Sequence, residues 1–287
     1  MNLTEQLAAF ASNTTFSTLP TNVIEECKRD MLDSIGCALA AKGQSKADKG
    51  IACGVSIGGT DGPATIIGTG QRSSMFGAAF ANGEMISTLD ADSVLVPGHV
   101  SPYVLPGAFA VSEALHRSGR DLIAAVAAGL EVTCRLGVAK RLGIVDSGFI
   151  FTPLLGYFGA TAAAGRAYGL SPDEMLNAFG IVYSYVAGNH QVTRDASLMK
   201  RIQVGQSAQA GVVAVQMAKR GIRGAQNVFE GIDGFFRVYL QNRIDAQVVR
   251  QDLGSRFELM NLSYKPYPCC RANHSPVDAA LKARAQS

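Results

Sequence analysis

The sequence has few charged side chains and no cluster of basic ones. Charged residues make up 17% of the 287 positions and hydrophobic residues 47%, so the chain has enough apolar surface for a sizeable core and disorder is not expected. The net charge of +3 is spread along the chain, with no aromatic residues between the lysines and arginines. This pattern gives no support for nucleic-acid binding.

A secretory signal and a membrane span are also missing. Residues 1–5 read MNLTE, without the basic start and the apolar run of a signal peptide. The most apolar windows are interrupted by Glu131 and Arg166, short of the roughly 18 uncharged residues that a membrane helix needs. We therefore expect a cytoplasmic protein with no membrane partner.

The cysteines have neither the paired spacing of a zinc site nor a secretory context for disulfides. A C-x-x-C pair is absent, and the neighbours Cys269 and Cys270 cannot easily both ligate one tetrahedral ion. We predict no metal, and we expect most of the thiols to be free and buried.

Helical periodicity dominates the chain. Apolar residues from Ile24 to Leu39 share one face of a helix that we expect to begin at the capping pair Asn22 and Glu25. Residues 65–67 predict a minor hairpin or edge strand, and the small residues 159–165 indicate close helix packing. The clearest helix start is residues 171–174 (SPDE). Further helices are predicted at about 74–88, 102–117, 121–136, 155–168, 172–187, 205–220, 227–236 and 275–285.

The pattern changes near residues 242–254. Residues 257–264 alternate with a period close to two, which predicts a strand. One strand and one helix cannot bury a core by themselves. We therefore predict a mainly α protein, with a large all-helical domain over residues 1–245 and the start of an incomplete α+β domain over residues 255–287.

Polar side chains gather in the loop from Asp90 to His99. Asp90, Asp92 and His99 lie between two predicted helices, with a turn at Pro97-Gly98 before the histidine. A carboxylate and an imidazole could together move a proton to or from a carbon next to a carboxyl group. Alternatively, the two acids cap the next turn and His99 only packs.

Two other stretches carry positive charge. Lys200 and Arg201 precede a predicted helix that begins at Gly205, which suits a carboxylate site, although solvated surface charge explains them equally. Residues 264–274 contain two prolines and the donors Lys265, Arg271 and His274. Cys270 in the same stretch is a nucleophile only if a partner lowers its pKa. The remaining histidines, at positions 116 and 190, are interpreted as a helix-surface residue and a loop residue.

In this order, the stretches resemble the MmgE/PrpD family, which includes 2-methylcitrate dehydratase, cis-aconitate decarboxylase and iminodisuccinate epimerase. The resemblance covers nearly the whole chain and implies a cofactor-independent homodimer with its active site between a large helical domain and a smaller α+β domain. It also implies a C-terminally truncated chain, and a small di- or tricarboxylate as substrate. The segments that carry it are residues 30–37, 82–99, 156–170, 200–211, 230–237 and 265–274.

The resemblance also implies roles for individual residues. Asp90 matches the first acid of the family's aspartate-rich loop and His99 the histidine that closes it. Lys200 matches the lysine ahead of the glycine-led helix, and Lys265 and His274 match the lysine and the histidine of the proline-rich segment. These five are the predicted catalytic residues.

The chain departs from the family pattern at several positions. Gln203 and Cys270 stand where family members have histidines, and both are predicted to contact substrate. Ile150 replaces a histidine that often follows Gly-Phe, and Ser93 and Val94 replace a further acid and a threonine or a glycine-histidine pair. The surroundings of the loop therefore have fewer titratable groups.

The resulting hypothesis is a lyase, either a dehydratase or a decarboxylase, that acts by proton transfer next to a carboxylate. Lys200, Lys265 and Arg271 would bind substrate carboxylates, and His99, oriented by Asp90, would transfer the proton. Two alternatives remain open: an epimerase or isomerase of a dicarboxylate, and a catalytically inactive truncated member of the family.

Overall fold

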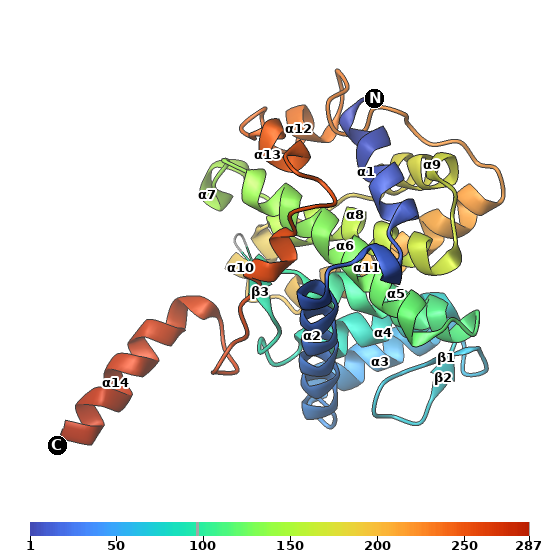
Figure 1. The fold of residues 1–287 in the computed structure, drawn as a ribbon. Coiled ribbons are helices and arrows are strands. Elements are labelled where there is room, and N and C mark those ends of the chain that lie inside the picture. Colours follow the sequence, from blue (N-terminus) through green and yellow to red (C-terminus); the bar gives the residue numbers. More distant parts are fainter. Residues whose placement is uncertain (96–97, 287) are drawn as a thin grey trace.

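The computed structural model describes residues 1–95 and 98–286, and it is mainly α-helical, as the sequence predicts (Figure 1). The predicted turn at Pro97 lies outside the described residues. The strands form two short antiparallel hairpins, β1 (Ala64–Thr65) with β2 (Arg72–Ser73) and β3 (Val94–Leu95) with β4 (Gly98–His99). The helices are α1 (Leu3–Asn13), α2 (Thr21–Ala40), α3 (Ser45–Gly58), α4 (Met75–Ser87), α5 (Ser101–Ala114), α6 (Gly119–Ala139), α7 (Ile144–Ser147), α8 (Phe151–Tyr168), α9 (Pro172–Tyr183), α10 (Gln191–Arg194), α11 (Met199–Lys219), α12 (Phe235–Val238), α13 (Ala246–Arg250) and α14 (His274–Gln286).

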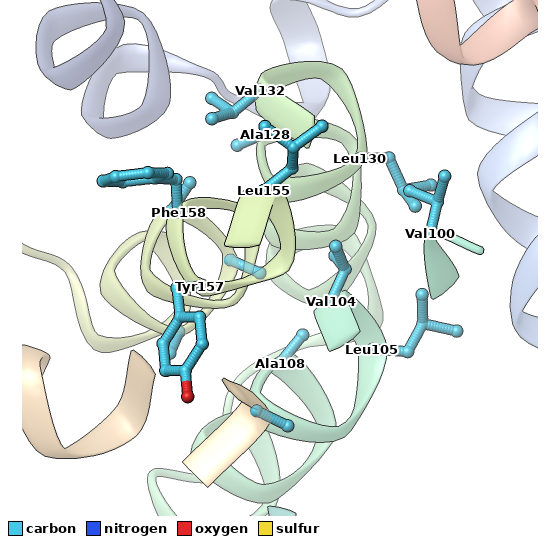
Figure 2. Packing of buried hydrophobic residues seen from close by; sticks show 14 of the residues in the cluster. Val100, Val104, Leu105, Ala108, Ala128, Leu130, Val132, Leu155, Tyr157 and Phe158 are labelled. Atoms are coloured by element: carbon cyan, nitrogen blue, oxygen red, sulfur yellow. The ribbon is translucent and has the colours of Figure 1, made fainter. Parts of the chain in front are cut away.

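The core lies where α8 packs against α5, α6 and α11. Figure 2 shows Val104, Ala128 and Leu155 at the meeting of α5, α6 and α8. Close approach requires small residues here, because a Cβ at Gly129 would lie 2.7 Å from the carbonyl oxygen of Gly159. By length and composition, α6 could cross a membrane. However, 89% of its 18-residue apolar stretch is buried inside the protein, as in a core helix.

Several predicted boundaries are confirmed and others are wrong. At the start of α9, Ser171 Oγ accepts from the Glu174 N–H (3.2 Å) and the Glu174 carboxylate accepts from the Ser171 N–H (2.8 Å), which confirms the predicted capping box. The minor hairpin is also confirmed. α2, however, begins one residue before the predicted Asn22 cap, after Pro20, and the Glu25 side chain instead accepts from Lys28 Nζ at 2.7 Å.

Two predicted elements in the second half are wrong. Residues 257–264 form no strand, because a 3-10 helix (Glu258–Asn261) occupies this stretch. The buried Glu131 carboxylate accepts from the N–H groups of Glu258 (3.0 Å) and Leu259 (3.1 Å), which bends the backbone around it. The helix predicted at 227–236 is also wrong, because the only helix in this part of the described chain is the short α12. The helix predicted to begin at Gly205 is present as α11, but it begins six positions earlier, at Met199. α1 and α3 were not predicted.

A buried ion pair fastens the segment after α13 to the helical body. Arg135 and Glu131 of α6 are both fully buried and lie 2.6 Å apart, Nε to Oε1. The Arg135 guanidinium also donates to backbone carbonyls of residues 249, 251, 252 and 256, at 2.6 to 3.2 Å. Every donor of the guanidinium group is thus used to hold the chain between α13 and the 3-10 helix.

The last helix stands apart from this body. α14 has no buried residue and projects away from the other helices (Figure 1). Residues 255–265, by contrast, pack against the body through the buried Phe257, Leu259 and Leu262. A second domain that begins at residue 255 therefore stays a prediction.

We expect the substitution Arg135→Met to destabilise the protein by about 3–5 kcal/mol, because it leaves the Glu131 carboxylate buried without its charge partner. The free energy of unfolding in urea is the measurement. Arg237→Met is the matched control, since Arg237 and Asp233 form an exposed pair at 3.5 Å, and its loss should cost less than about 1 kcal/mol. Equal effects of the two substitutions would contradict a stabilising role of the buried Arg135–Glu131 pair.

Candidate active site

The loop between α4 and α5 carries the acid and histidine residues, and two short pairings fix its shape. β3 and β4 pair Val94 with His99, and the Val94 backbone also exchanges two hydrogen bonds of 2.9 Å with Ser263. Asp90 has a positive φ of 57°, a conformation that favours glycine or asparagine over most residues. The loop therefore lies directly beside the segment that brings Lys265.

Asp92 holds the His99 ring. His99 Nδ1 lies 2.6 Å from Oδ2 of the fully buried Asp92, and His99 Nε2 lies 3.5 Å from Asp90 Oδ1. Because an ionised carboxylate only accepts, Nδ1–H donates to Asp92 and Nε2 faces Asp90. Asp90 was predicted to orient His99, but in the structure Asp92 makes the shorter contact with its ring.

Asp90 gathers the positive charges of the site. Its Oδ1 accepts from Lys265 Nζ at 2.6 Å, and its Oδ2 lies 2.9 Å from Arg201 and 3.6 Å from Lys200 Nζ. Burial by itself would raise the pKa of Asp90, but the charge of His99, the hydrogen bond from Lys265 and the charge of Arg201 together hold it well below its usual range. One carboxylate thus faces three cations.

Three further acids have raised pKa values, of which Asp30 and Glu84 are buried and Asp33 is partly buried. Asp30 Oδ1 accepts from the hydroxyl groups of Ser93 and Ser101, each at 2.7 Å, and burial raises the pKa of Asp30 to about 7. Burial, together with the charge of Asp92, raises the pKa of Asp33 to about 6. Burial also raises the pKa of Glu84, which accepts from the Gly205 N–H, to about 7.

A cavity of about 630 Å³ opens in front of His99. Five of the predicted site residues line it, and it also contains two residues whose role the sequence did not indicate, Thr152 and His190. The predicted residues at its wall are His99, Lys200, Lys265, Cys270 and Arg271. The cavity therefore places an imidazole and three cationic side chains around one space.

Three predicted site residues, Asp90, His274 and Gln203, are not among those that line this cavity. Asp90 contacts Lys200 and Lys265 at its wall. His274 Nε2 lies 3.3 Å from the Cys269 carbonyl oxygen, and its ring packs edge-on against Tyr267 at 5.3 Å between centroids. Gln203 is buried, and its Nε2 lies 3.5 Å from the Asn189 carbonyl oxygen. The catalytic role of His274 and the substrate contact of Gln203 stay predictions.

The acids and the histidine also form a conceivable metal site. Ligand atoms of Asp90, Asp92 and His99 all lie within 4.8 Å of one another. Lys265 and Arg201 already contact both oxygens of Asp90, so a cation placed there would meet two positive charges. This charge pattern favours an anion over a metal ion.

The raised pKa values of Asp30, Asp33 and Glu84 predict how stability depends on pH. These groups bind protons more tightly when folded, so their contribution is fully present below their unfolded pKa and is lost as pH rises through about 6 to 7. We expect the free energy of unfolding to fall between about pH 5.5 and pH 8, by roughly 1 to 2 kcal/mol for an acid such as Asp30.

The variant Asp30→Asn tests this expectation in urea titrations at several pH values. Its amide oxygen can still accept from Ser93 and Ser101, but it does not titrate, so the decline with pH should become shallower. Asp90 has a lowered pKa and loses its contribution only at much lower pH, so it does not obscure the result. An unchanged slope in the variant would refute the assignment to Asp30.

The chain is similar in sequence to proteins of one family. Residues 5–247 match the MmgE/PrpD N-terminal domain. A cis-aconitate decarboxylase of Aspergillus terreus is 28% identical over 96% of this chain and 59% of its own length, and one of Mus musculus is 28% identical over 99% and 59%. The cis-aconitate decarboxylase-like protein oryM of Aspergillus oryzae is 27% identical over 98% and 61%. The chain thus spans about 60% of the length of these curated relatives, and by the extent of the domain match it belongs to the MmgE/PrpD family.

Proposed function

We propose that the protein is a cofactor-independent lyase that acts on a small di- or tricarboxylate by proton transfer next to a carboxylate. The observation that carries this proposal is that His99, Lys200, Lys265 and Arg271 line the same cavity. The cis-aconitate decarboxylases among the relatives support a substrate of this class.

The charge of the site favours an anionic ligand. Asp90 supplies one negative charge against the positive charges of Lys265, Arg201 and Lys200, and Arg271 adds another at the cavity wall. Lys200 makes the longest of the three contacts with Asp90 and its side chain is 34% exposed. It can therefore turn from Asp90 to a substrate carboxylate at small cost.

The geometry suits His99 for proton transfer. With Nδ1–H bound to Asp92, Nε2 can take a proton from a carbon next to a substrate carboxylate, or return one to it. The C–H electron pair would pass into the neighbouring carboxylate, where Lys200 or Arg271 would stabilise the added charge. In a dehydration, the hydroxyl group of the neighbouring carbon would then leave as water. In a decarboxylation, carbon dioxide would leave first, and His99 would deliver a proton to the electron pair left on carbon.

The assembly of the protein is part of the same proposal. We propose a cytoplasmic homodimer, supported by exposed apolar side chains on α2, where Leu32 is 73% and Leu39 50% exposed. These two residues are seven positions apart and share one face of the helix.

The variants His99→Asn and Lys200→Ala test the function. We expect His99→Asn to lower kcat/KM for citrate or cis-aconitate by at least about 10²-fold, the usual worth of a general acid or base. Lys200→Ala should raise KM by about tenfold or more through the loss of a charged hydrogen bond.

Product analysis separates the two lyase reactions, since carbon dioxide is released only in decarboxylation. His116→Asn and Lys219→Ala are the matched controls: neither residue lines the cavity, and Lys219 pairs with Glu174 at 2.9 Å near the other end of α11. Unchanged rates in both His99→Asn and Lys200→Ala would refute the proposed function.

A further inference from the structure

Backbone hydrogen bonds hold His190 in place at the cavity wall. Its backbone N–H donates to the Gly148 carbonyl oxygen at 2.8 Å, and the Ile150 N–H donates to the Gly188 carbonyl oxygen at 3.0 Å. A bridge between Phe149 and Asn189 completes this antiparallel pairing. Because residue 151 begins α8, a core helix, the pairing joins the backbone at His190 to the start of that helix.

The ring of His190 is free to react. Among the residues that the structure describes, none donates to or accepts from its ring nitrogens, and the residue is only partly buried. The charged groups around the same space are Lys200, Lys265 and Arg271, while Asp195 of the adjoining turn is bonded to Gln191 at 2.7 Å. His190 thus differs from His99, whose Nδ1 is held by a buried acid.

We propose that His190 is the second proton-transfer group of this cavity, and that the reaction is the elimination of water from a hydroxylated di- or tricarboxylate. This inference rests on the proposed function. Decarboxylation leaves an electron pair on carbon that takes up one proton, so one proton-transfer side chain is enough for that reaction. Elimination of water moves two protons, one off carbon and one onto the leaving oxygen, and the cavity holds two imidazoles for them.

His99 Nε2 takes the proton from the carbon next to a carboxylate, and the C–H electron pair forms the carbon–carbon double bond. The C–O bond to the neighbouring carbon breaks, and the hydroxyl group leaves as water with the proton of the His190 imidazolium. The proton gained by His99 returns to solvent, and His190 takes one up from solvent.

The side chains of the four histidines can be followed separately by NMR of their ring Cε1–H groups. The probe is tricarballylate, a tricarboxylate with no hydroxyl group to eliminate. We expect it to shift the resonances of His99 and His190, which line the cavity, and to leave that of His116, which does not line it, in place. A shift of His99 without a shift of His190 overturns this inference and leaves the proposed function standing. No shift of either overturns both.

The variant His190→Asn gives the kinetic test, with His116→Asn as its matched control. We expect hydration of cis-aconitate, the reverse of the elimination, to fall by at least about 10²-fold in kcat with a much smaller change in KM. The pH profile of kcat/KM should lose one of its two limbs, which a merely structural role would not cause. The assignment of His190 is overturned if the variant keeps both limbs of the pH profile or if only its KM rises. It is also overturned if the variant releases carbon dioxide as the product at an unchanged rate. If the wild-type protein is inactive on all these substrates, the proposed function itself is overturned.

Discussion

The carboxylate of Asp90 is the contact on which the site depends. It joins three parts of the chain that are far apart in sequence, because it lies on the loop after α4 and binds Arg201 and Lys200 of α11 and Lys265 of the segment after the 3-10 helix. Without that charge, three cationic side chains would face one another, and two of them, Lys200 and Lys265, lie at the wall of the cavity. The same contacts leave a surplus of positive charge that an anionic substrate can neutralise.

Lys265 reaches this place because of a second buried charge. Glu131 binds the N–H groups at the start of the 3-10 helix, and Arg135 binds four backbone carbonyl groups of the segment that precedes it. The chain therefore leaves the helical core at a fixed point, from which Ser263 pairs with Val94 and Lys265 turns toward Asp90. The buried Arg135–Glu131 pair of the core therefore helps to position Lys265 in the site.

Local patterns in the sequence predicted much of the fold and the position of the site. The capping box at Ser171 and the apolar periodicity of α6 and α8 are local signals, and the loop from Asp90 to His99 was recognisable from its composition. The errors arise from distant contacts. The alternation of residues 257–264 indicated a strand, but the Glu131 carboxylate, 127 positions earlier than Glu258, bends the backbone there. The sequence did not indicate that Asp92, and not Asp90, contacts His99 Nδ1. This choice depends on the positive φ of Asp90 and on the β3–β4 pairing.

The central claim is that Asp90 and Lys265 interact strongly enough to organise the site, and a double-mutant cycle measures that interaction directly. The variants are Asp90→Asn, Lys265→Met and the double variant, and the free energy of unfolding is measured for all of them and for wild type. Since Lys265 is nearly buried and lies 2.6 Å from Asp90, we predict a coupling energy of at least about 1.5 kcal/mol. Additive effects, with a coupling within about 0.3–0.5 kcal/mol of zero, would contradict the account.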